Sequence, residues 1–144
     1  MPKTLSIAAF AAMVAGIAAL YYVHALVAVR PGFIALQVAA VLLMIAARIT
    51  FGRRSFHAAA NPTAGGVVQN GPYAYIRHPI YAAAIYFVWA GALDRFSWQA
   101  AVSAALVTAG AFIRMNMEER LLVGRYPEYA AYMARVRRIV PFIY

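Results

Sequence analysis

Long apolar stretches separated by short breaks constrain this chain more than any other feature. Residues 5–29, 33–51 and 98–117 are almost entirely apolar, and a further apolar stretch ends near Leu93. A membrane-spanning helix needs about 20 apolar residues. The 144-residue chain is 65% hydrophobic, and a soluble domain of this size buries too little surface to hide such a composition. We therefore expect an all-α integral membrane protein with four transmembrane helices.

Helix-breaking residues lie between these stretches. Arg30, Pro31 and Gly32 interrupt the first pair, and residues 94–97 form a turn in which Ser97 is a candidate N-cap. The chain is expected to be a single membrane domain over residues 1–144, with helices over about 5–29, 33–51, 73–93 and 97–123.

The basic residues predict the orientation. There are 13 Lys and Arg against 4 Asp and Glu, and basic residues collect on the cytoplasmic side of membrane proteins. With a cytoplasmic N-terminus, only Arg30 and Arg95 fall outside. The others fall inside: Lys3, Arg48, Arg53, Arg54, Arg77, Arg114, Arg120, Arg125, Arg135, Arg137 and Arg138. Both termini are therefore expected to be cytoplasmic, and the charge to serve anionic lipid headgroups rather than nucleic acid.

Two polar segments lie on the cytoplasmic side in this topology. Residues 52–72 form a loop long enough to suggest a working role. Residues 126–138 are predicted to form an interfacial helix. Its apolar face comprises Tyr126, Tyr129, Ala130, Met133 and Val136.

The segment from Arg77 to Tyr81 is the first candidate site. Because Pro79 suits the first position of a helix, a helix is expected to begin there. Residues 79–93 then span about 22 Å, which is short for a hydrocarbon core of about 30 Å. The open helix start is an anion-binding feature, with Arg77 and His78 as further donors. The alternative is that His78 only caps the helix.

The second candidate site is on the last apolar stretch. Arg114 and Glu118 are four residues apart and share a helix face near the inner headgroup boundary. An acid at that depth is costly and is a functional candidate. The alternative is a structural ion pair, and Glu119 is expected to be a solvated neighbour. The three histidines, at positions 24, 57 and 78, show no metal-binding spacing, so no metal is expected.

The chain resembles the isoprenylcysteine carboxyl methyltransferase family, which is related to the membrane phospholipid methyltransferases. The resemblance covers roughly residues 50–144 and depends on two motifs. The first runs from Gly71 to Tyr81 without a break. The second is Arg114, Glu118, Glu119, Leu122, Tyr126, Tyr129, Tyr132, Arg135, Val136 and Pro141.

This resemblance implies S-adenosylmethionine as the cofactor, held at the cytoplasmic face. It places His78, Tyr81, Tyr73 and Glu118 in contact with the cofactor. It also implies that the stretch Gly65, Gly66, Val67 and Val68 lines the cofactor pocket. Arg114 is implied to face the reacting group of the substrate.

The predicted function is S-adenosylmethionine-dependent methyl transfer to a lipophilic acceptor that enters from the bilayer. A carboxylate acceptor is favoured because it needs no base and Arg114 can orient it. The alternatives are a phospholipid amine acceptor, an NADPH-dependent membrane reductase, or a non-catalytic membrane module. Four short helices leave little room for a lipid-sized acceptor, so pairing of chains into a homo-oligomer is a further hypothesis.

Overall fold

The computed structural model describes residues 2–52 and 66–144, and this part of the chain is helical without strands. The loop expected over 52–72 therefore lies largely outside the described residues. The elements are α1 (Pro2–Tyr22), α2 (Pro31–Phe51), the 3-10 helix η2 (Gly71–Ala74), α3 (Pro79–Asp94), α4 (Trp98–Arg125) and α5 (Glu128–Arg135). The all-α expectation is confirmed for these residues.

Three of these helices are long and apolar enough to cross a membrane: α1, α2 and α4. Helix α3 is apolar but has 16 residues, or about 24 Å at 1.5 Å per residue. That length is below the hydrocarbon thickness of about 30 Å. Whether α3 is a fourth membrane-spanning helix therefore stays a prediction.

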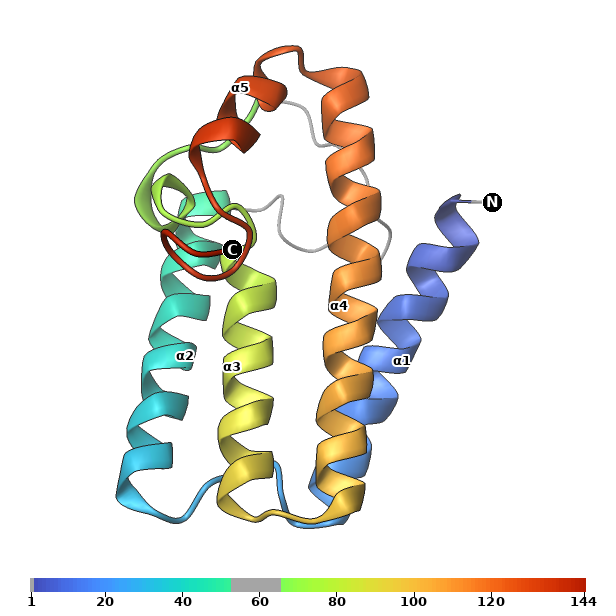
Figure 1. The fold of residues 1–144 in the computed structure, drawn as a ribbon, viewed down its shortest axis with the longest axis vertical. Coiled ribbons are helices and arrows are strands. Elements are labelled where there is room, and N and C mark those ends of the chain that lie inside the picture. The colour runs from blue at the N-terminus through green and yellow to red at the C-terminus, as the bar shows by residue number, and fades with distance from the viewer. Residues whose placement is uncertain (1, 53–65) are drawn as a thin grey trace.

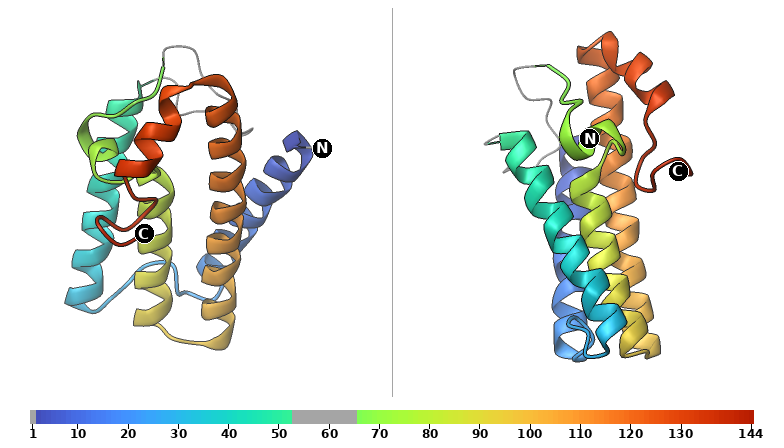
Figure 2. Two further views of the ribbon diagram at one scale, coloured as in Figure 1. Left: turned by 45° about the horizontal axis from the view of Figure 1, so that its top comes forward. Right: turned by 90° about the vertical axis from the view of Figure 1, so that its left-hand side faces the viewer.

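The long helices lie side by side in the order α2, α3, α4, α1 (Figure 1). Helix α2 packs on α3, α3 on α4, and α4 on α1. The start of α1, the start of α3, the end of α4 and helix α5 all lie toward one end of the bundle (Figures 1 and 2). Residues from distant parts of the sequence therefore meet at this end.

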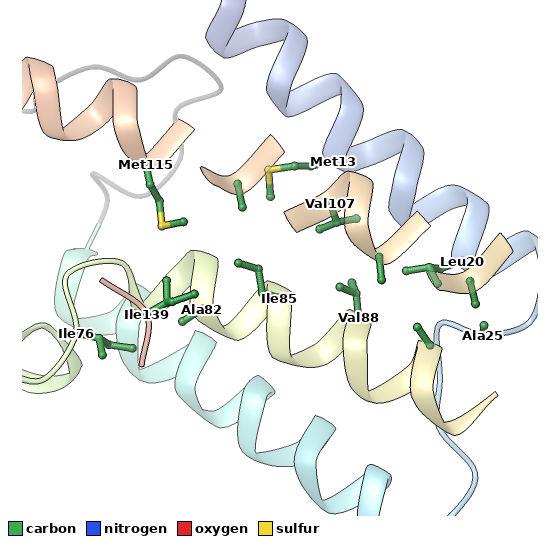
Figure 3. Packing of buried hydrophobic residues seen from close by; sticks show 14 residues of the cluster. Met13, Leu20, Ala25, Ile76, Ala82, Ile85, Val88, Val107, Met115 and Ile139 are labelled. Carbon is green, nitrogen blue, oxygen red and sulfur yellow. The ribbon is translucent and has the colours of Figure 1, made fainter. Parts of the chain in front are cut away.

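The core is built from small and medium apolar side chains between α1, α3 and α4 (Figure 3). Ile139 of the C-terminal tail lies beside Ala82 of α3 in the same cluster. Glycine permits the close approach of α1 to α4, because a Cβ at Gly110 would lie 2.7 Å from the Ala9 carbonyl oxygen. Small residues at helix contacts are typical of membrane bundles.

The outward face of α2 is apolar, whereas its buried residues are Gln37, Ala40 and Ala47. The large exposed side chains of this helix are Ile34, Leu36, Val38, Val41, Leu42 and Ile45, with Ile49 near its end. An apolar outer face over a partly polar contact is the arrangement expected when lipid is the solvent.

The helix predicted over 5–29 was too long, because α1 ends at Tyr22. Residues 23–30 instead fold back against α2 and α3, and the buried amide of Gln37 holds them. Its Nε2 donates to Leu26 O at 2.8 Å and Phe87 O at 3.0 Å, and its Oε1 accepts from Ala28 N at 2.9 Å. Unpaired backbone groups in apolar surroundings are costly, and the Gln37 side chain removes that cost by pairing with them, so the helix can end early.

Two further bounds differ from the sequence prediction. The third helix begins at Pro79 rather than near residue 73, because proline has no N–H and holds the preceding residue out of the helical region. The tail helix is α5 alone, Glu128–Arg135, rather than 126–138. Beyond it the chain extends, and Arg137 pairs with Ile76 in an isolated parallel bridge. By contrast, Ser97 caps α4 as expected, accepting from Ala100 N at 3.1 Å.

Candidate functional site

Four of the predicted site residues, His78, Tyr81, Arg114 and Glu118, meet where the start of α3 packs against the C-terminal half of α4. His78 occupies the N-cap position of α3, but its side chain makes no capping hydrogen bond. Its ring is 5% exposed, and its Nε2 lies 3.0 Å from Glu119 Oε1. The alternative that His78 merely caps the helix is therefore wrong, since the side chain is directed to α4.

Glu119 is the centre of the first cluster, and the expectation of a solvated residue was wrong. Its side chain is 5% exposed and accepts from three cationic or imidazole groups. Arg77 Nη2 lies 2.9 Å from Glu119 Oε1, and Arg138 Nη2 lies 2.5 Å from Glu119 Oε2. With His78, these contacts join the start of α3, the end of α4 and the C-terminal tail.

The side chain of Arg77 is therefore held by contacts within the protein. Besides Glu119, its Nη1 donates to the carbonyl oxygens of Met133 at 3.0 Å and Val136 at 2.5 Å. The sequence interpretation placed Arg77 as an anion-binding donor beside the helix start. In the structure it instead fixes the end of α5 against the start of α3. The carbonyl groups at the end of a helix have no intrahelical donor, and Arg77 provides one.

The second cluster is formed by Tyr81, Glu118 and Arg114. The Tyr81 hydroxyl donates to Glu118 Oε1 and accepts from Arg114 Nε at 2.8 Å. Arg114 Nη2 lies 3.6 Å from Glu118 Oε1. The side chain of Glu118 remains 25% exposed, whereas that of Arg114 is 5% exposed. Glu118 is therefore the accessible charged group of this cluster.

Helix α1 also reaches the second cluster. Arg114 Nη1 donates to both the carbonyl and the hydroxyl oxygen of Ser6, each at 3.2 Å. The guanidinium carbon lies 5.3 Å from the centroid of the Phe10 ring. The ion pair of Arg114 with Glu118 is thus one contact in a larger network rather than an isolated structural pair.

His78 lies between the two clusters. Its Nδ1 is 3.9 Å from Glu118 Oε2, while its Nε2 bonds to Glu119. Neighbouring residues of a helix point about 100° apart, so the two acids address different sides of the start of α3. Glu119 faces the tail, and Glu118 faces Tyr81 and Arg114.

Helix α5 and the 3-10 helix form the rim of this region. The Tyr132 hydroxyl donates to Tyr73 O at 2.6 Å, and burial raises the pKa of the Tyr132 phenol to about 12. The phenol therefore stays protonated and keeps its donor role at neutral pH. The Tyr73 ring stacks on Phe51 at the end of α2, with centroids 5.6 Å apart.

The glycine-rich stretch predicted to line the pocket is only partly described. Gly65 lies outside the described residues. Gly66 has φ +79°, which glycine adopts without strain. Val67 packs on the cluster of Tyr129, Tyr132 and Val136, and Val68 is half-buried. The described part of this stretch therefore approaches α5.

The sequence reasoning gave no site role to four residues of these clusters. Glu119 was expected to be solvated, Tyr132 was only part of the second motif, and Arg138 and Ser6 were not candidates. Two of them carried a signal. Ser6 is a polar residue inside an apolar stretch, and Glu119 is one of only four acids. No group of metal-binding side chains is present among residues 2–52 and 66–144.

Chemically, the arrangement combines the start of α3, an accessible carboxylate at Glu118 and a phenol at Tyr81. The backbone N–H groups in the first turn of a helix lack intrahelical acceptors and favour a negative group. A carboxylate favours a cation or a hydroxyl. The region therefore suits a ligand that carries both kinds of group.

The comparisons with known proteins support the related family of the sequence resemblance, the membrane phospholipid methyltransferases, and do not confirm the isoprenylcysteine carboxyl methyltransferase family. No curated protein matches the chain, and no solved structure matches it. The model of the phospholipid methyltransferase family matches residues 32–129, which include α2, α3, α4 and both motifs up to Tyr129. Since this match covers more than half of the chain, the protein belongs to the phospholipid methyltransferase family, a family of membrane methyltransferases.

Proposed function

We propose that this protein transfers a methyl group from S-adenosylmethionine to a lipophilic acceptor that reaches the start of α3 from the bilayer. The observation that carries the proposal is the cluster of Tyr81, Glu118 and Arg114, in which one carboxylate stays accessible among buried partners. The family match favours methyl transfer over the reductase and the non-catalytic alternatives.

The donor set fits the proposed cofactor. The first turn of α3 offers the N–H groups of Ile80 and Tyr81 to the cofactor's carboxylate, because Pro79 has no N–H and His78 N donates to Arg138 O. Glu118 is accessible to its ammonium group or its ribose hydroxyls, and the half-buried Val67 and Val68 offer apolar surface for the adenine. Tyr73 is 6% exposed and stacks on Phe51, so it offers the adenine little surface. Bound there, S-adenosylmethionine supplies an electrophilic methyl group on a sulfonium. The chain's own residues bind and orient the cofactor and the acceptor, and they exclude water from the site.

Arg114 takes a positioning role in this proposal. A carboxylate acceptor held by Arg114 requires a free edge of the guanidinium. Its Nε and Nη1 already donate to Tyr81 and Ser6, and its Nη2 lies near Glu118. Binding a carboxylate would displace these contacts.

A phospholipid headgroup amine is the acceptor that the geometry supports better. An alkylammonium is attracted by the accessible carboxylate of Glu118. It must lose one proton, to water at the headgroup boundary, before its nitrogen lone pair can attack the methyl carbon. The carbon–sulfur bond then breaks, and its electron pair stays on sulfur. The carboxylate acceptor suggested by the sequence resemblance is the competing outcome of the test below.

The membrane arrangement proposed with this function has four spanning helices and both termini in the cytoplasm. Its support is the distribution of basic residues and the position of both termini on the side of the bundle that holds the start of α3 and the end of α4 (Figure 1). The site then lies at the cytoplasmic boundary of the bilayer.

Cofactor binding is tested by calorimetry of the purified protein with S-adenosylhomocysteine. We expect Glu118→Ala to weaken binding at least about tenfold, as for loss of a charged hydrogen-bonding partner. Glu128→Ala is the matched control, since Glu128 is an exposed acid of α5, and its affinity should equal that of the wild type. Absence of binding to the wild-type protein would contradict the proposed function.

The acceptor is tested with a methyl-labelled donor and vesicles that contain phosphatidylethanolamine, compared with vesicles that contain a lipid carboxylate. Treatment with base separates the outcomes, because a methyl ester releases labelled methanol, which is volatile, whereas an N-methyl group stays on the non-volatile ethanolamine headgroup. Label that stays on the amine supports the proposal. Released methanol shows the carboxylate acceptor instead.

A further inference from the structure

Helix α1 lies outside the residues that match the family, yet it contacts the second cluster. The family match begins at residue 32, ten residues after the end of α1. Ser6 nevertheless provides two of the oxygen atoms to which Arg114 donates, and Phe10 lies beside the guanidinium. The part of the chain that defines the family therefore does not hold Arg114 by itself.

The approach of α1 to α4 is close over several turns. A Cβ at Gly16 would lie 2.8 Å from Ser103 O, and a Cβ at Gly110 would lie 2.7 Å from Ala9 O. Any side chain at either position would push the two helices apart. Because Ser6 lies one turn before Ala9, this contact sets the distance between Ser6 and Arg114.

Burial makes this contact important for Arg114. The residue is 4% exposed inside a bundle whose neighbouring side chains are largely apolar. A charged group in such surroundings is costly unless hydrogen-bond acceptors surround it. Ser6, which is 1% exposed, and the ring face of Phe10 provide an acceptor and a cation–π partner from α1.

We propose that Ser6 is a positioning residue for the methyl-transfer step, acting through Arg114, and that α1 thereby completes the site. This inference rests on the proposed function. Ser6 holds Nη1 of Arg114, so Nε of the same guanidinium points to the Tyr81 hydroxyl. The contact of Arg114 with Tyr81 is 2.8 Å, whereas that with Glu118 is 3.6 Å. A displaced Arg114 therefore disturbs Tyr81 more than Glu118.

The test compares Ser6→Ala with Ser103→Ala in the full-length protein. Ser103 is a matched buried serine, whose hydroxyl donates to Gln99 O within α4. We expect Ser6→Ala to lower kcat/KM for the acceptor about tenfold, because one hydrogen bond to a buried charge is lost. The Kd of S-adenosylhomocysteine should change by less than about twofold, which is a small free-energy change. A displaced Arg114 disturbs Tyr81 more than Glu118, and Glu118 is the residue proposed to hold the cofactor. Ser103→Ala should leave both quantities unchanged.

A second pair of variants keeps the proposal testable if Ser6→Ala folds poorly. Phe10→Leu removes the ring beside Arg114, and Phe33→Leu removes the corresponding ring beside Arg30 at the opposite end, where the distance is 5.1 Å. Only Phe10→Leu should lower turnover. Unchanged turnover in both Ser6→Ala and Phe10→Leu would overturn the inference. An equal loss of cofactor affinity and turnover would also overturn it. The proposed function would survive both results, because it is tested by two properties of the wild-type protein: binding of S-adenosylhomocysteine and transfer of the methyl label to vesicles.

Discussion

The two ends of the bundle each contain a buried acid that bonds to arginine, but the acids have different surroundings. At the end away from the site, Asp94 accepts from Val29 N at 2.6 Å and from Arg30 Nε at 2.5 Å. The Arg30 side chain is 60% exposed. This acid joins the end of α3 to the segment before α2, and water reaches its cationic partner.

At the site end, Glu119 bonds to Arg77, His78 and Arg138, whose side chains are 9%, 5% and 21% exposed. A second acid, Glu118, stands beside it with its own arginine and phenol. Closing a turn needs one acid and donors from the two neighbouring residues Val29 and Arg30, as Asp94 shows. The site end contains more buried charged groups than closing a turn requires. Buried charges are costly for stability, so the additional ones indicate a function.

The largest effect is expected for Glu119→Ala. Removing this carboxylate leaves Arg77, His78 and Arg138 facing one another without an acid. Loss of one partner of a buried charge pair costs about 3–5 kcal/mol. We expect a large drop in the thermal unfolding temperature in detergent, with loss of cofactor binding. A small change, equal to that of the exposed Glu128→Ala, would show that the cluster contributes little to stability.

A smaller effect is expected for Asp94→Ala at the other end. The variant loses hydrogen bonds to Val29 N and Arg30, but Arg30 stays hydrated because its side chain is exposed. A destabilisation of about 1–3 kcal/mol is expected for the backbone donor that remains. Calorimetry should show the affinity for S-adenosylhomocysteine unchanged. Weakened binding would mean that the two ends are coupled, and it would contradict the view that Asp94 only closes a turn.

The positions of the long helices could be predicted from the sequence. The apolar stretches predict helices from length and composition alone, and proline and serine mark their starts at Pro79 and Ser97. These signals are local. The early end of α1 is not local, because it depends on Gln37, which satisfies backbone groups from two other segments.

The same distinction holds for the site. The spacing of Arg114 and Glu118 predicts a shared helix face, and the motif at His78 and Tyr81 identifies their partners by resemblance. The role of Glu119 depends on where the C-terminal tail returns, and Arg138 is 19 residues away in the sequence. Ser6 depends on the packing of α1 on α4 through glycines. Neither contact follows from any periodic pattern.

The smallest effect is expected for Arg138→Ala. Glu119 keeps Arg77 and His78, so only one of three partners is lost. We expect a destabilisation of about 1–2 kcal/mol. Arg137→Ala is the matched control, because the Arg137 side chain is exposed and its contribution is the backbone carbonyl that accepts from Arg77 N at 2.7 Å.

Hydrogen exchange locates the effect of Arg138→Ala. The tail beyond α5 is held by the bond from His78 N to Arg138 O and by the Tyr86 hydroxyl, which donates to Ile139 O. Loss of the Arg138 side chain should speed exchange in residues 136–144 and leave α4 protected, since local opening follows the weakest contacts. Faster exchange in Arg137→Ala to the same extent would show that the charge of the tail, rather than the contact with Glu119, holds it on the site.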